Sequence, residues 1–244
     1  MKYGSIATGS KEALDSAKII LEIGGNAFDA AIGAAFTSML SEFSLTGAGG
    51  GGILLGMSKG ESPIIYDFFV DCPKLIDKKI DFKKVSVNFG DTVQKFQVGR
   101  GSVAIPGNIA GLLDVHNEKG RLPLHAILEP AIVISKNGVV LSPYQAYINS
   151  LVKPILLLSK EGNKIFKPQN KFLVKGDIFK NPNFTNFLQQ LSKEGKDFFY
   201  KGELSKLICK NFGDTGYITQ ESLAGYNMKK RTPISFRINE YTII

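Results

Sequence analysis

The sequence has little of several residue types on which common active sites depend. Its 244 residues include two histidines, two cysteines and no tryptophan. His116 and His125 alone leave almost no material for a histidine metal site or a Ser-His-Asp triad, and His116 is expected at a helix end instead. Cys72 and Cys209 match no metal or redox spacing, so both are expected to be packed thiols. No apolar run approaches bilayer length, which predicts no membrane span.

Arginine is also scarce, although the formal net charge is +8. The positive charge comes almost wholly from lysines, which are spread along the chain without a helical stripe or interleaved aromatic residues. This pattern predicts a solvated surface and no nucleic-acid partner. Residues 1–4 lead into a polar segment with no apolar leader visible, so a cytoplasmic location is the default expectation. Sequence missing upstream would change that to a periplasmic or extracellular one.

Residues 24–52 are the most informative stretch. Gly24 and Gly25 are expected to end a helix over 10–23, and Asn26 to cap a second helix with a face of small residues at Ala27, Ala31 and Ala35. The block at 47–52, GAGGGG, formally satisfies the phosphate-loop pattern G-x-G-x-x-G. That loop needs a strand before it and a helix after it, whereas here the order is reversed. A close-packed backbone crossing is the favoured interpretation.

The rest of the chain predicts a single mixed domain over 1–244, of class α+β. Alternating apolar residues predict two hairpins, one over 53–57 and 63–70 and the other over 85–89 and 92–98. Helical periodicity and capping signals predict helices at 108–119, 124–137, 143–159, 182–194 and 203–211. Residues 234–244 alternate in the manner of a terminal strand.

An ordered set of short motifs resembles the gamma-glutamyltransferase (gamma-glutamyltranspeptidase) family across essentially the whole chain. The matching pieces are ATGS at 7–10, GGNAFDAA at 24–31, SLTG and the glycine run at 44–52, SVAIPG at 102–107, AGL at 110–112, GRLP at 120–123, EPA at 129–131, KNG at 136–138, FYKGEL at 199–204 and LAGY at 223–226. Each piece is weak by itself, and the set in this order is specific.

The resemblance implies an N-terminal-nucleophile hydrolase with a four-layer αββα sandwich, incomplete in this chain. Family members are precursors that cut themselves into a large and a small subunit, and the new N-terminal Thr attacks an amide such as that of glutathione. The resemblance places this chain in the large subunit, with the small subunit of the same precursor as partner and a small-molecule amide as substrate. The chemistry needs no metal or other cofactor. The chain alone is then expected to be inactive. Two alternatives are a non-catalytic structural or binding protein that keeps the scaffold and a separately encoded partner chain.

One position departs from the family pattern. Typical members carry Asp-Phe-Arg-Glu-x-Ala-Pro after the glycine run, and the Arg binds the α-carboxylate of the substrate. Here the run is DFFVDCP at 67–73, so Phe69 stands at the position of that Arg. Phenylalanine cannot form the bidentate, charge-assisted pair that a guanidinium makes with a carboxylate. We therefore expect poor use of glutathione and acceptance of a more apolar group, with Arg100 as a weaker candidate for a replacement cation.

Overall fold

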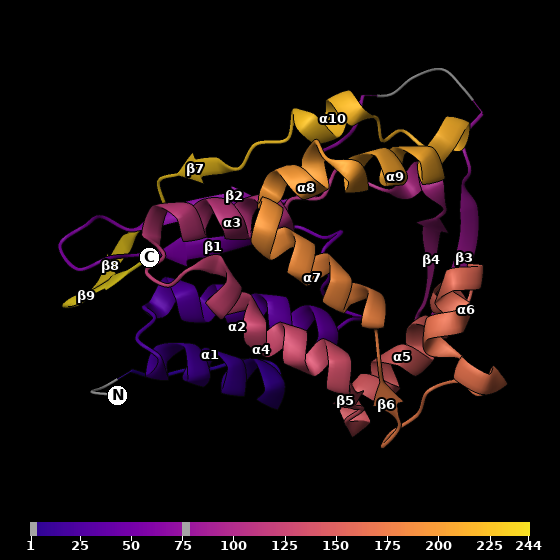
Figure 1. Cartoon of the computed structure of the whole chain (residues 1–244), viewed down its shortest axis with the longest axis horizontal. Helices are drawn as coiled ribbons and strands as arrows, with labels where there is room; N and C mark the ends of the chain where they lie inside the picture. Colours follow the sequence, from indigo (N-terminus) through magenta and orange to yellow (C-terminus); the bar gives the residue numbers. More distant parts are fainter. Residues whose placement is uncertain (1–3, 75–78) are drawn as a thin grey trace.

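The computed structural model describes residues 4–74 and 79–244, so the first three of the residues 1–4 discussed above lie outside it. The larger helices and the strands are arranged as in Figure 1. They are α1 Lys11–Glu22, α2 Ala27–Ser41, β1 Gly52–Gly56, β2 Ile64–Phe68, β3 Lys83–Asn88, β4 Val93–Val98, α3 Asn108–Lys119, α4 Leu124–Asn137, β5 Val139–Val140, α5 Pro143–Leu156, α6 Lys160–Phe166, β6 Ile178–Phe179, α7 Pro182–Glu194, α8 Lys196–Tyr200, α9 Glu203–Phe212, α10 Gln220–Ala224, β7 Lys229–Arg231, β8 Phe236–Ile238 and β9 Tyr241–Ile243.

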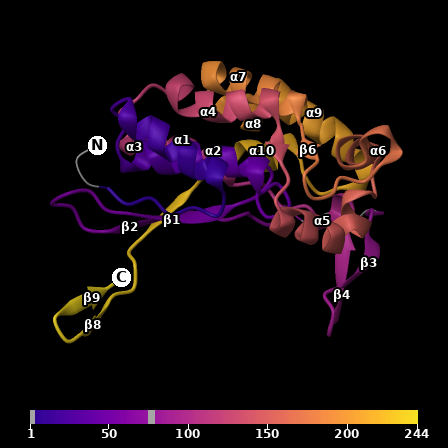
Figure 2. The same cartoon turned by 90° about the horizontal axis from the view of Figure 1, so that it is seen from below.

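Helices cover one face of a three-stranded antiparallel sheet ordered β1-β2-β7 (Figure 2). Burial alternates along β2, where Tyr66 and Phe68 are buried on the helical face while Asp67 between them points to the other. On β1, Ile53 and Leu55 lie on the open face and are 64% and 50% exposed. Both predicted hairpins are confirmed, as β1–β2 and β3–β4, with Gly60 and Gly90 at positive φ in their turns.

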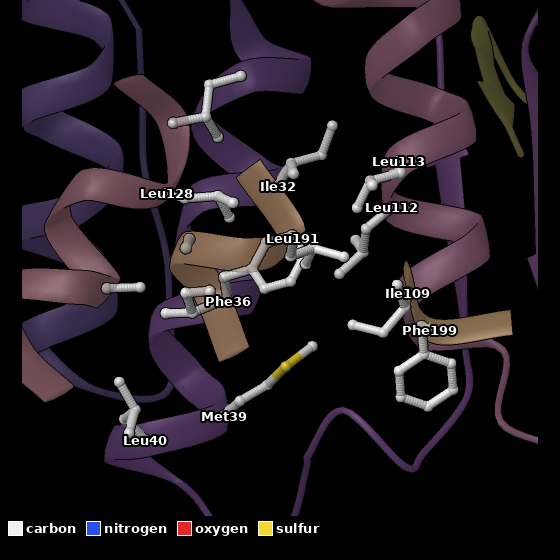
Figure 3. Packing of buried hydrophobic residues seen from close by; sticks show 14 of the residues in the cluster. Ile32, Phe36, Met39, Leu40, Ile109, Leu112, Leu113, Leu128, Leu191 and Phe199 are labelled. Carbon is white, nitrogen blue, oxygen red and sulfur yellow. The ribbon is translucent and has the colours of Figure 1, made fainter. Parts of the chain in front are cut away.

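The apolar core lies between α2, α3, α4 and α7, where the ring of Phe36 and the side chains of Ile32, Leu128 and Leu191 meet (Figure 3). Gly33 lets α2 approach both α1 and α4 closely, because a Cβ there would lie 2.0 Å from Ile20 Cδ1 on α1 and 3.0 Å from the carbonyl oxygen of Ile127 on α4. The close approach therefore occurs at Gly33. The small-residue face predicted at Ala27, Ala31 and Ala35 does not make it, since Ala27 and Ala31 are exposed.

The predicted start of the second helix is confirmed, with a reciprocal cap. Asn26 Oδ1 accepts a hydrogen bond from the amide of Asp29, and Asp29 Oδ2 accepts one from the amide of Asn26. The fully buried Asp29 carboxylate also accepts hydrogen bonds from the amides of Arg121 and Leu122. One side chain thus fixes both the start of α2 and the loop before α4.

Three predictions were wrong. The helix predicted over 143–159 stops at Leu156, and Ser159 caps the next helix by accepting a hydrogen bond from the amide of Gly162. The terminal strand predicted over 234–244 is instead the hairpin β8–β9, which turns where Asn239 adopts a φ of 53°. Cys72 is exposed, because it follows the end of β2 where the chain leaves the sheet, and only Cys209 is partly buried.

In the part of the chain that the structure describes, no helix combines the length and the apolar character needed to cross a membrane.

Candidate functional site

The chain bends at the end of β2 and turns two neighbouring phenylalanines to opposite sides. Phe68 is buried against α3, while Phe69 is 62% exposed. Just beyond the strand, Asp71 and Ile105 exchange two backbone hydrogen bonds of 3.0 and 2.8 Å, which tie the bend to the loop that precedes α3. The backbone around Phe69 is therefore fixed while its ring remains available to a ligand.

Glycines pack against this bend from two sides. A Cβ at Gly107 would lie 1.9 Å from the carbonyl oxygen of Phe68, and a Cβ at Gly51 would lie 2.5 Å from the amide nitrogen of Val70. At Gly111 a Cβ would meet the Phe68 ring at 2.0 Å. Side chains at these positions would displace the backbone that carries Phe69.

Two stacked tyrosines hold the same region from the C-terminal part of the chain. Tyr226 donates a 2.8 Å hydrogen bond to the carbonyl oxygen of Phe69, and Tyr200 donates one of 2.8 Å to that of Pro106. Their ring centroids are 5.8 Å apart. Burial raises the pKa of Tyr226 to about 12, so its hydroxyl stays protonated and able to donate at neutral pH.

A charged group lies on the open face of the sheet beside Phe69. Asp67 Oδ1 accepts a hydrogen bond from the Phe69 amide at 3.1 Å, and Asp67 Oδ2 accepts one from Arg231 Nε at 2.6 Å. These two hydrogen bonds, the first being the larger cause, hold the pKa of Asp67 below its usual value. Phe69, Arg231 and Lys229 line one hollow of about 190 Å³. The carboxylates of Asp67 and Asp71 line the same hollow, so its two positive charges are balanced by two negative ones beside the apolar ring of Phe69.

Arg100 does not belong to this hollow. Its guanidinium donates a 3.3 Å hydrogen bond to Thr215 Oγ1, and its amide donates one to Asp81. The structure therefore does not bring together the two residues singled out from the sequence. The cations beside Phe69 are Lys229 and Arg231, which sequence reasoning missed. Their only local signal was the run KKR at 229–231 in a chain with four arginines.

The glycine block makes a backbone crossing and is not arranged as a phosphate loop. The carbonyl oxygen of Gly50 accepts hydrogen bonds from the amides of Gly107 and Asn108, at 2.9 and 3.0 Å. Two amides at the start of α3 are thus already bonded to the glycine block itself and do not face an anion. Close packing explains Gly51, whereas a Cβ at Gly47 or Gly49 would meet nothing within 4 Å. Within the described ranges, no three His, Cys, Asp or Glu side chains gather where they could hold a metal ion.

Comparison with known proteins gives one consistent result. The sequence profile of the family described as Gamma-glutamyltranspeptidase matches residues 13–244. Glutathione hydrolase 2 of Arabidopsis thaliana is 26% identical over 243 residues, covering 99% of this chain and 41% of the relative. Acylase ACY 1 proenzyme of a Pseudomonas species is 28% identical, over 99% of this chain and 44% of the relative.

Among solved structures, Helicobacter pylori gamma-glutamyltranspeptidase superposes with a TM-score of 0.86 at 27% identity, covering all of this chain and 69% of that one. The predicted N-terminal-nucleophile hydrolase fold is thereby confirmed, with its mixture of helix and sheet. The chain spans about two fifths of the length of the curated relatives it matches.

Proposed function

The chain belongs to the gamma-glutamyltranspeptidase family, and on that premise we propose that it forms the first part of the large subunit of a self-processing amidohydrolase. The nucleophile is an N-terminal Thr that precursor cleavage exposes in the small subunit, beyond these 244 residues. Its hydroxyl attacks the carbonyl carbon of a small-molecule amide, the amine departs, and water or an amino acid resolves the acyl-enzyme. The observation that carries the proposal is the family match over residues 13–244.

The contribution of this chain is to position the acyl group. The bend after β2 has a backbone held by Gly51, Gly107 and Tyr226, and it displays position 69 beside the hollow containing Arg231. A pre-formed backbone is what a residue needs if it is to orient a substrate. By itself the chain lacks the nucleophile, so it is inactive until joined by the small subunit. Names such as glutathione hydrolase proenzyme among the relatives support a precursor that is processed.

The substrate preference that we propose follows from Phe69. An exposed phenyl ring favours an apolar acyl group over the charged α-carbon end of a gamma-glutamyl group, because a carboxylate against it would lose water without gaining a partner. One relative is named Acylase ACY 1 proenzyme, a name consistent with an acyl-group substrate. Arg231 is already paired with Asp67 and therefore does not simply replace the missing family arginine.

The substitution Phe69→Arg in the complete precursor tests the proposal. We expect kcat/KM for a gamma-glutamyl anilide to rise about tenfold or more, because a charge-assisted pair contributes about 1.5–3 kcal/mol. The value for a hexanoyl anilide should fall. Phe89→Arg, a 41% exposed phenylalanine in the turn after β3, is the matched control and should change neither value.

An unchanged ratio between the two substrates in Phe69→Arg would contradict the assignment of position 69. A correctly expressed precursor that neither cleaves itself nor hydrolyses either anilide would favour the alternative, a scaffold protein without chemistry.

A further inference from the structure

A groove lies between α1 and α4, two helices that pack against each other. Figure 1 shows where these helices lie in the fold. Its volume is about 730 Å³, within the range of pockets that hold small molecules. Ile19 on α1, Ile23 just after α1 and Val133 on α4 line it and are 46%, 53% and 42% exposed. None of the residues that line the hollow beside Phe69 takes part, so the groove is separate from the proposed acyl site.

The floor of the groove contains a polar atom that the fold leaves unused. Ser16 lines the groove and is 1% exposed, and its Oγ has no hydrogen-bond partner. It is one of two such buried side-chain atoms in the described part of the chain. A buried hydroxyl without a partner is unfavourable, so a ligand that bonds to it recovers part of that free energy.

A second acceptor comes from the backbone of α4. Pro130 lies inside this helix and has no amide hydrogen, so the carbonyl of Ala126, four residues earlier, lacks its usual helical hydrogen bond. Ala126 and Pro130 both line the groove. The groove therefore contains a carbonyl oxygen, that of Ala126, to which a ligand can bond only by donating a hydrogen.

The charges around the groove are acidic, in contrast to the net charge of +8 of the whole chain. Glu12, Asp15 and Glu129 line it, together with His125, and no lysine or arginine of the described residues does. Asp15 is paired with Lys11, whereas Glu12 and Glu129 take part in none of the ion pairs found among the described residues. An anionic ligand would meet repulsion here, and a cationic one attraction.

We propose that this groove binds an amphiphilic organic cation, a primary ammonium with an alkyl or aryl body. The three N–H donors of the ammonium match the Ser16 hydroxyl, the Ala126 carbonyl and the Glu129 carboxylate, and the body covers Ile19 and Val133. A neutral alcohol of the same length offers a single donor and no charge. A fatty carboxylate carries a negative charge, which the acidic residues around the groove repel.

Three ligands with one alkyl body test the proposal on the ¹⁵N-labelled 244-residue chain at pH 7: n-octylammonium, octan-1-ol and octanoate. Two-dimensional NMR should show saturable shifts for the amides of α1 and α4 with octylammonium, and an affinity about tenfold above that of octan-1-ol. Octanoate should produce no saturable shift. Glu129→Gln should weaken octylammonium binding roughly fivefold, and Ser16→Ala roughly threefold, without changing octan-1-ol binding.

Glu22→Gln is the matched control, because Glu22 is on α1, is paired with Lys18 and does not line the groove. It should leave octylammonium binding unchanged, and the spectrum of each variant shows directly whether it is folded. Equal affinities for octylammonium and octan-1-ol would overturn the proposal, as they would show only an apolar surface. Concentration-dependent shifts of the same amides without ligand would also overturn it, because a second copy of the chain would then occupy the groove.

Discussion

At the scale of single residues, the backbone around position 69 depends on neighbouring glycines, which have no side chain. Gly107 has a φ of −112°, which any residue can adopt, so backbone freedom does not explain its presence. Space does, because a Cβ there would also lie 2.3 Å from the Tyr226 hydroxyl. The same hydroxyl holds the carbonyl of Phe69.

Gly107→Ala is therefore expected to lower the free energy of unfolding by about 2 kcal/mol or more through steric overlap. Gly49→Ala, in the glycine block but in open space, should change it by less than about 0.5 kcal/mol. Urea denaturation of the two variants measures the difference. Equal stabilities would mean that the bend after β2 yields freely and does not fix Phe69.

The residues around Phe69 were predictable to different degrees. Phe69 was singled out because the motif of the family carries an arginine at this position, and its role stays a prediction. Arg231 and Lys229 were not found, because they reach this hollow only through the pairing of β2 with β7, whose partners Asp67 and Lys229 are more than 160 residues apart in the sequence. No local pattern encodes such a pairing, which depends on how the intervening helices pack.

At the scale of elements, Asp29 joins α2 to the loop at 120–122. Asp29→Ala leaves the amides of Asn26, Arg121 and Leu122 without their acceptor, and we expect a loss of about 3 kcal/mol in the free energy of unfolding. Asp15→Ala, which removes an exposed carboxylate from α1, should cost less than about 1 kcal/mol. Thermal unfolding followed by circular dichroism distinguishes the two. Similar losses of stability in the two variants would show that the Asp29 cap of α2 stabilises the fold no more than an exposed carboxylate does.

Local sequence signals predicted most of the helices and strands. They did not predict two boundaries, the start of α6 and the turn between β8 and β9. The caps at Ser10, Asn26 and Ser142 were visible because each places a side-chain acceptor three residues before the amide it bonds. Ser159 offers the same signal, but the helix predicted over 143–159 runs up to it and so hides the start of the next helix. The turn at Asn239 was missed because alternation continues on both sides of it, and only its left-handed backbone separates β8 from β9.

At the scale of the whole molecule, the helices protect one face of the β1-β2-β7 sheet and leave the other open (Figure 2). Ile53, Leu55 and Met57 are 64%, 50% and 64% exposed in or just after β1. The outer edge of β1 pairs with no strand among the described residues. An apolar face beside an unpaired edge favours pairing with another chain.

We therefore expect the 244-residue chain to self-associate with rising concentration, as measured by sedimentation velocity. Leu55→Lys should reduce the association, because a charge on an edge strand must be desolvated when a second strand pairs with it. Val140→Lys, a substitution at a 59% exposed valine in β5, is the matched control and should leave it unchanged. A chain that stays monomeric, or two variants that associate equally, would contradict the expectation that β1 mediates self-association. The complete precursor should be less prone to associate than this chain, because the proposed small subunit would cover the same face.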